Sequence, residues 1–291
     1  MTFYAIAVKI QKERISGGKR MYPKSNLHTH TTFCDGKISP AEMVDAAIEK
    51  GLVTLGFSGH AQMIGHGERW CMSETGTQAY RAAVRAIARE RADEIEIALG
   101  VEQDIFAISS TEGYDYVIGA VHMVRKDGDE APVDSSPEEL DRGVREMYNG
   151  DIYALIEDFY RLSAEAPRAT GADIAAHFDL VRKFNKGGAR FDECDKRYRD
   201  AAMTALSEAA KSDVIFEINT GGKYRVGCDL YPSRELLTEL KSIGGRITFS
   251  SDSHDARSLC YKFDEAKRLA KSCGFKTAWT WSGGGFKEFK I

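Results

Sequence analysis

The sequence predicts a single α/β barrel. Seven apolar runs rich in β-branched residues are separated, in most cases, by patterns typical of amphipathic helices. The apolar character of each run is continuous rather than alternating, which indicates strands covered on both faces, as in a parallel sheet. Strand and helix alternate without a break, and 291 residues suffice for one large barrel. The seven runs are Asn26–His30, Leu52–Ser58, Ile95–Val101, Asp115–Val121, Asp173–His177, Val214–Asn219 and Arg246–Ser251.

Two of the expected helices begin with clear N-terminal signals. Ser39-Pro40-Ala41-Glu42 supplies an N-cap, a first-turn proline and a capping-box glutamate, and Ser136-Pro137-Glu138-Glu139 repeats the arrangement. Gly283-Gly284-Gly285 lies close to the C-terminus with no Walker motif after it, so we expect a turn rather than a phosphate-binding loop. Further helices are expected at Ala79–Asp93, Asp151–Glu165, Cys194–Lys211, Ser233–Ser242 and Phe263–Ser272.

The barrel pattern starts only after Met21. We therefore divide the chain into an N-terminal extension, residues 1–20, and a barrel domain, residues 21–291. The apolar stretch from Phe3 to Val8 lacks the basic region and the cleavage site of a secretion signal. No run is long enough to cross a bilayer, so no membrane partner is expected.

Composition argues against a nucleic-acid partner. The net charge of -4 leaves no basic footprint, although a local cationic pocket stays open as an alternative. The cysteines are scattered, without the paired spacing of a structural zinc site. We expect reduced thiols in a cytoplasmic protein. The six cysteines are Cys34, Cys71, Cys194, Cys228, Cys260 and Cys273.

Residues that can bind metals follow most of the predicted strands. Glu102 and Asp252 end strands that are otherwise nearly apolar, where a carboxylate is costly unless it is paired or bound to a metal. Six of the seven histidines also lie at strand ends, which meet at one rim of a barrel. The seventh, His66, is expected to be a solvated or substrate-loop residue. The six are His28, His30, His60, His122, His177 and His254.

Each of these residues also has a structural interpretation when it is considered alone. His28 and His30 are two apart on a strand and point to the same side, but they could be satisfied loop histidines. Asp35, followed by glycine, could be an oxygen ligand or part of a turn. Glu102 and Asp252 could pair with arginines. The repetition at one topological position is what favours a metal centre.

Six short segments hold these residues: His28-Thr29-His30, Phe33-Cys34-Asp35-Gly36, Phe57-Ser58-Gly59-His60-Ala61, Gly119-Ala120-Val121-His122, Ala176-His177-Phe178-Asp179-Leu180 and Ser251-Asp252-Ser253-His254. Together they resemble the polymerase-and-histidinol-phosphatase (PHP) superfamily, over about Asn26 to Phe275. Within it, the chain is most similar to the stand-alone histidinol-phosphate phosphatases. That branch is favoured by the segment from His177 to Phe184, by Glu217-Ile218-Asn219-Thr220 and by Tyr231-Pro232-Ser233.

The resemblance implies a distorted (β/α)7 TIM-like barrel of the PHP type with two or three divalent metal ions. By motif, one ion would be bound by His28, His30, Glu102 and Asp252. Glu102 would bridge this ion to a second, held by His122 and His177. The third would be held by Asp35, His60 and His254. Many members have histidine at the position of Asp35, and the carboxylate favours Mn²⁺ or Fe²⁺, although the set would also accept Zn²⁺.

The resemblance also implies a metal-dependent phosphomonoesterase that hydrolyses L-histidinol phosphate in histidine biosynthesis. Clustered metals lower the pKa of a bound water and neutralise phosphoryl oxygens. The catalytic candidates are Glu102 as the bridge and Asp252 or His254 as proton donor to the leaving alkoxide. The phosphate dianion calls for cations, and the candidates are Arg182, Lys183 and, more weakly, Arg257. For Arg182 and Lys183 a solvated helix start is the alternative.

Two other functions stay open. A PHP phosphoesterase could act on another small phosphate ester, such as a nucleoside bisphosphate or a sugar phosphate, because the metal ligands are shared and only the pocket differs. A non-catalytic PHP module could bind metal for stability or for a protein partner. Every ligand position carries a competent residue, which favours an enzyme with a small-molecule partner. The sequence does not predict the oligomeric state.

Overall fold

The computed structural model describes residues 24–291, and the predicted extension, residues 1–20, lies outside them. A seven-stranded sheet forms the centre, in the order β1-β2-β3-β4-β7-β8-β9, with every neighbouring pair parallel. Each predicted run overlaps one of these strands, which confirms the number and order of the strands, although β1 shares only Asn26 with its run and β3 continues three residues past Val101. The strands are β1 (Ser25–Asn26), β2 (Thr54–Phe57), β3 (Glu96–Asp104), β4 (Tyr116–Ala120), β7 (Ile174–Ala175), β8 (Ile215–Asn219) and β9 (Arg246–Ser250).

The first and last strands meet just beyond their regular ends. The backbone N–H of Ser253 donates to the carbonyl of His28, and the N–H of His30 donates to the carbonyl of Ser253. These two bonds form a parallel bridge between Thr29 and Ser253, which brings the sheet close to a closed barrel. The bridge also places the segment after β1 directly beside the segment after β9.

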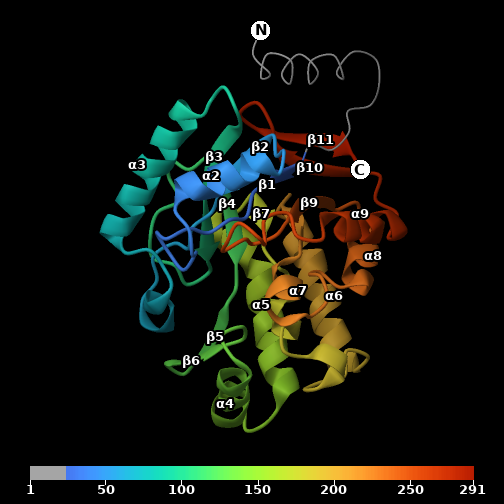
Figure 1. Ribbon diagram of the computed structural model, residues 1–291. Coiled ribbons are helices and arrows are strands. Elements are labelled where there is room, and N and C mark those ends of the chain that lie inside the picture. Colours follow the sequence, from blue (N-terminus) through green and yellow to red (C-terminus); the bar gives the residue numbers. More distant parts are fainter. Residues whose placement is uncertain (1–23) are drawn as a thin grey trace.

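Helices surround the sheet (Figure 1). The predicted capping box is present, since Ser39 and Glu42 each accept from the other's backbone N–H. Ser136 likewise accepts from the N–H of Glu139. The helices are α2 (Pro40–Glu49), α3 (Glu74–Glu90), α4 (Pro137–Met147), α5 (Ile152–Thr170), α6 (Lys196–Ala210), α7 (Gly221–Val226), α8 (Arg234–Ser242) and α9 (Phe263–Ser272), with short 3₁₀ turns η1 (Gly65–Arg69), η2 (Leu180–Arg182) and η3 (Lys186–Gly188). Over residues 24–291, none of the helices combines the length and apolar character needed to cross a membrane.

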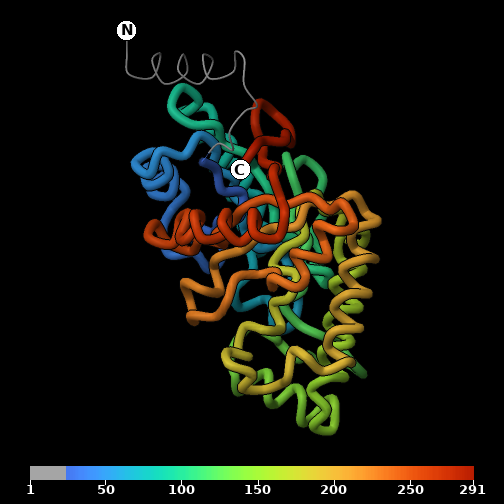
Figure 2. The backbone as a smooth tube through the Cα atoms, turned by 90° about the vertical axis from the view of Figure 1, so that its right-hand side faces the viewer, coloured from blue at the N-terminus to red at the C-terminus, as the bar shows by residue number. Residues whose placement is uncertain are grey.

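Two antiparallel hairpins were not predicted. The first, β5 (Met123–Lys126) with β6 (Asp129–Pro132), leads into α4 and projects from one end of the molecule in Figure 1. The second, β10 (Thr277–Trp281) with β11 (Phe286–Lys290), lies toward the opposite end, as Figure 2 also shows. The turn expected at Gly283–Gly285 is confirmed, because the N–H of Ser282 donates to the carbonyl of Gly285.

Candidate metal centre

Glu102, in the second half of β3, lies at the centre of the candidate site. The side chain is 1 % exposed, and both carboxylate oxygens face imidazole nitrogens from other strand ends. Oε2 lies 2.9–3.3 Å from nitrogens of His28, His30 and His60. Oε1 lies 3.0 Å from Nε2 of His177 and 3.3 Å from Nε2 of His122. Five predicted ligands therefore surround the sixth.

The remaining three predicted ligands extend this cluster on one side. Nε2 of His254 lies 3.1 Å from Oδ2 of Asp35, and Nε2 of His60 lies 3.5 Å from its Oδ1. Oδ1 of Asp252 lies 3.2 Å from Nε2 of His30. Asp252 has a φ of 47°, in the left-handed region that aspartate tolerates better than most residues. The structure thus brings all nine predicted ligand side chains into one continuous cluster.

The atoms at the centre of the cluster fit divalent cations. Nε2 of His28, Nε2 of His30 and Oε2 of Glu102 are fully buried and have no hydrogen-bond partner among the described residues. Buried polar atoms without partners are costly, and a cation between them would satisfy all three. Potential ligand atoms converge within 4.8 Å in three groups: His28, His30 and Glu102; His60, Glu102 and His122; and His30, Asp35, His60 and His254.

The charge states of Glu102 and His30 also suit metal binding, whereas for His28 and His122 burial lowers the pKa but neighbouring carboxylates raise it well above the usual range. Burial by itself would raise the pKa of Glu102, but His28, His60 and His122 lower it well below its usual range. Burial lowers the pKa of His30 to about 3, with His60 and His254 acting in the same direction. An ionised carboxylate and a neutral imidazole are the forms that coordinate a metal.

Two carboxylates outside the predicted set orient ligand histidines. Oε2 of Glu217 lies 2.9 Å from Nδ1 of His28, and Oδ2 of Asp104 lies 3.0 Å from Nδ1 of His122. Each contact leaves the opposite nitrogen, Nε2, facing the centre, which is the usual support for a metal-binding histidine. Asp104 could have been found from the sequence, because it follows Glu102 by two positions on one strand and so points to the same side.

A cavity of about 230 Å³ opens beside the cluster. Its wall includes two cations, Lys183 and Arg225, and the predicted loop residue His66. A larger hollow of about 820 Å³ lies elsewhere, along α5 and α6, but none of the nine cluster residues lines it. The smaller cavity is therefore the candidate substrate site.

Of the three predicted substrate-binding cations, Lys183 alone lines this cavity. The guanidinium of Arg182 turns away and is held by Oδ2 of Asp179 at 3.1 Å and Oε2 of Glu193 at 2.9 Å. Arg257 is exposed and also lies outside the lining. The structure therefore gives no support to Arg182 or Arg257 as phosphate ligands.

Arg225, which the sequence analysis did not single out, lines the cavity in which Arg182 and Arg257 were expected. Nη2 donates to Oδ2 of Asp252 at 2.6 Å, and Nη1 donates to the Asp252 carbonyl at 2.9 Å. Arg225 lies on α7, which follows β8 directly. A Cβ at Gly221 would lie 2.9 Å from the Ser251 carbonyl oxygen, so glycine allows α7 to pack this close to β9.

Comparisons with known proteins agree with this geometry. A family model described as the PHP domain matches residues 26–221. A "probable histidinol-phosphatase" of Deinococcus radiodurans is 27% identical over 260 residues, which cover 86% of this chain and 94% of that protein. The histidinol-phosphatase of Lactococcus lactis is 25% identical over 284 residues, covering 89% and 95%.

Two solved structures share the fold. The histidinol phosphate phosphatase of Lactococcus lactis, complexed with Zn, L-histidinol and phosphate, aligns with a TM-score of 0.68 at 22% identity, covering 91% of this chain and 99% of that one. A candidate histidinol phosphatase of Listeria monocytogenes aligns with a TM-score of 0.71 at 19% identity, covering 83% and 99%. The comparisons confirm the resemblance inferred from the motifs and the barrel that it implied.

Proposed function

This chain belongs to the PHP domain family, and from that premise we propose that it is a metal-dependent phosphatase that hydrolyses L-histidinol phosphate to L-histidinol and phosphate, a reaction of histidine biosynthesis. The observation that carries the proposal is the cavity lined by two cations beside nine converging metal-type ligands. Relatives named histidinol-phosphatase, which match over most of their length, support the choice of substrate.

The ligand cluster would hold two or three divalent ions, for which Zn²⁺, Mn²⁺ and Fe²⁺ are the candidates. The ions would be held by His28, His30, Asp35, His60, Glu102, His122, His177, Asp252 and His254. Bound there, they would lower the pKa of a coordinated water and neutralise charge on the phosphoryl oxygens. Zn in the Lactococcus lactis relative supports a site of this kind.

The cavity residues would orient the phosphate ester. Arg225 and Lys183 present donors toward the space in which a phosphate dianion would lie. Asp252 and His254 both line the cavity, so they stay the candidates for donating a proton to the departing alkoxide. Glu102 is buried beneath them and would act as the bridging ligand rather than touch the substrate.

Cavity size favours a small ester over the nucleoside bisphosphate alternative. At about 230 Å³ the cavity is smaller than the roughly 300–1,000 Å³ typical of sites for drug-sized ligands. L-histidinol phosphate has one five-membered ring, a three-carbon chain and one phosphate, whereas a nucleoside bisphosphate has a base, a ribose and two phosphates.

The proposal is tested by phosphate release from purified protein that has been treated with a chelator and then reloaded with Zn²⁺, Mn²⁺ or Fe²⁺. L-histidinol phosphate should be preferred over p-nitrophenyl phosphate, AMP and a nucleoside 3′,5′-bisphosphate. Comparable turnover of all four would reject the substrate assignment. Metal binding without turnover of any would instead identify a non-catalytic module.

Arg225→Met and Arg182→Met separate the two arginines. Loss of a donor that stabilises developing charge lowers kcat/KM about 10²–10³-fold, and we expect this for Arg225→Met. Arg182→Met should leave kcat/KM within about threefold, and it should lower stability because the buried Asp179 loses its charged partner and keeps only the Ser233 N–H. Steady-state kinetics and urea unfolding measure the two effects. An equal loss of kcat/KM in both variants would contradict the assignment.

A further inference from the structure

One wall of the cavity comes from the β5–β6 hairpin rather than from the barrel itself. β5 begins directly after His122, and β6 pairs back along it with Pro132 opposite Met123. The N–H of Val133 then donates to the carbonyl of His122 at 2.9 Å. This pairing places the next residue, Asp134, in the cavity lining beside the ligand cluster.

Asp134 differs from the other two carboxylates that line this cavity. Asp35 and Asp252 face imidazoles of the ligand cluster, whereas Oδ2 of Asp134 lies 3.3 Å from Nζ of Lys183. The Asp134 side chain is 25 % exposed, and Oδ1 accepts no hydrogen bond from residues 24–291. This oxygen is therefore available to a bound molecule.

The Asp134 carboxylate is both charged and anchored. Burial raises its pKa, but Lys183 and His122 lower it by more, which favours the ionised form. Nζ of Lys183 also donates to the Asp134 carbonyl at 2.6 Å, which fixes the backbone.

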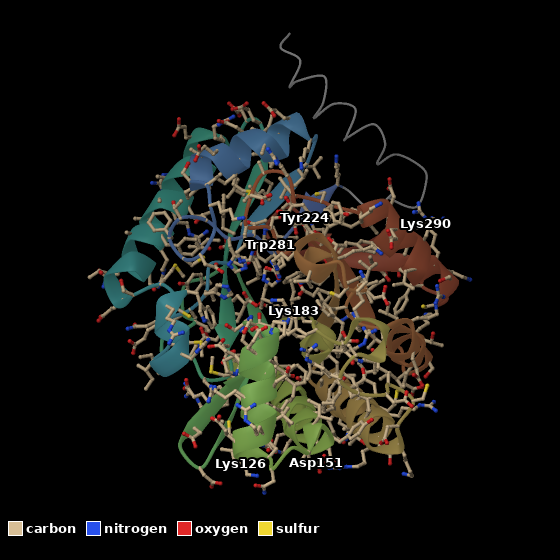
Figure 3. The ribbon with its side chains drawn as sticks, turned by 60° about the horizontal axis from the view of Figure 1, so that its bottom comes forward. Lys126, Asp151, Lys183, Tyr224, Trp281 and Lys290 are labelled. Carbon is tan, nitrogen blue, oxygen red and sulfur yellow. The ribbon has the colours of Figure 1, made fainter. Side chains whose placement is uncertain are left out.

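In Figure 3, Lys183 lies near the middle of the molecule, whereas Lys126, at the end of β5, lies at the periphery. The hairpin thus spans from the cavity to the outer surface.

We propose that Asp134 binds the protonated amino group of the substrate and so selects phosphate esters that carry an ammonium group near the ester oxygen. The inference rests on the proposed function, because L-histidinol phosphate has its ammonium on the carbon next to the ester-bearing carbon. Arg225 and Lys183 attract the phosphate, and Asp134 supplies the negative charge that a zwitterionic ester also needs. A charge-assisted hydrogen bond of this kind discriminates strongly against an uncharged analogue.

The test compares Asp134→Asn on L-histidinol phosphate and on its deamino analogue, 3-(imidazol-4-yl)propyl phosphate. Loss of one hydrogen bond between charged groups corresponds to about a 10–100-fold change, and we expect kcat/KM for L-histidinol phosphate to fall by this factor, mainly through KM. The analogue should change less than about threefold, because it lacks the contact. Asp129→Asn, an exposed position on the same hairpin, is the matched control and should leave both substrates unchanged.

Equal losses on both substrates would overturn the inference and identify Asp134 as a structural partner of Lys183. No loss on either would also overturn it. Calorimetric binding of L-histidinol gives a second readout without turnover, and Asp134→Asn should weaken it about 10-fold or more. Thermal melting of the variant confirms that it is folded.

A second substrate pair separates this inference from the proposed function. If the wild-type protein shows no preference for L-histidinol phosphate, the proposed function fails. The ammonium contact is then judged with O-phosphoethanolamine and ethyl phosphate, which differ only in the amino group. A wild-type preference for the first compound that disappears in Asp134→Asn supports the inference. Absence of that preference in the wild type rejects it.

Discussion

The two ends of the barrel are built in opposite ways. At the carboxyl ends of the strands, histidines and carboxylates face one another, and several of their atoms lack hydrogen-bond partners. At the amino ends, the β10–β11 hairpin packs Trp281 and Phe286 against Tyr116, and the space is filled by apolar groups. The first end is suited to binding a ligand, and the second contributes stability.

The change from one kind of packing to the other takes place within one strand. On β3, a Cβ at Gly100 would lie 2.3 Å from Cζ of Tyr116, so only glycine leaves room for that ring. The Tyr116 hydroxyl lies within hydrogen-bond distance of the carbonyls of Leu27 and Phe57 and shares its single proton between them. Two residues further on, Glu102 faces the imidazole cluster. Buried polar atoms lack hydrogen-bond partners at the carboxyl ends of the strands, whereas the groups named at the amino ends are hydrogen-bonded or apolar. This difference indicates a binding function at the carboxyl ends rather than poor packing.

Removing the carboxylate of Glu102 should have the largest effect on the metal-binding end of the barrel. Loss of a residue that only orients a metal ligand costs up to roughly 100-fold in activity. We expect Glu102→Gln to lower kcat/KM by more than this, because Glu102 contacts five histidines. Bound metal per protein should fall, as measured by elemental analysis. Glu96→Gln, at the opposite end of the same strand, is the matched control and should keep both metal and activity. Full metal content in Glu102→Gln would refute the bridging role.

A smaller effect is expected from the residue that orients His122. Asp104→Asn should weaken metal affinity or activity about 10–100-fold, because the amide no longer fixes the imidazole with Nε2 toward the centre. Competition with a chromophoric chelator measures the affinity, and excess metal should restore part of the activity. Asp115→Asn, in which the lost carboxylate pairs with Arg85 and not with a histidine, serves as the control for loss of a half-buried negative charge. Unchanged affinity in Asp104→Asn would show that packing alone orients His122.

At the base of the barrel, substitution should affect stability and not chemistry. Tyr116→Phe removes the one hydroxyl proton that the two buried carbonyls share, and we expect a loss of about 1–3 kcal/mol in the free energy of unfolding. kcat/KM and metal affinity should be unchanged below the melting temperature. Urea denaturation and steady-state kinetics measure the two quantities. A parallel loss of metal binding would show that the two ends are coupled.

Metal removal should lower the thermal stability of the folded protein. Ions that bind only the folded protein stabilise it, by about 4 kcal/mol when the free metal is 1,000-fold above Kd. We therefore expect chelation to lower the melting temperature of the wild type and to have little effect on metal-depleted Glu102→Gln. Differential scanning calorimetry with and without chelator measures the difference. A melting temperature that chelation does not change would show that the cluster is stable without ions.

Asp35 was assigned as the ninth candidate ligand, and the ligands were grouped by ion, only through the resemblance to the PHP superfamily. The barrel, the approximate strand positions and the other eight candidate ligands were predicted from the residues themselves. These features depend on local patterns, such as the continuous apolar runs and the polar residues at their ends, and a parallel barrel gathers strand ends at one rim whatever the loops do. The boundaries of α3 were less well predicted, since Gly76 in its first turn hid a start at Glu74.

The tertiary structure alone decided which cations and carboxylates face the cavity. Arg182 and Lys183 are neighbours in sequence, but adjacent side chains on a 3₁₀ turn point about 120° apart, so one binds Asp179 and the other lines the cavity. Arg225 reaches the cavity because β8 and β9 pair and bring α7 against Asp252. Asp134 reaches it through hairpin pairing with β5. Contacts of this kind depend on the direction of a side chain in three dimensions, which sequence spacing along an irregular loop does not specify.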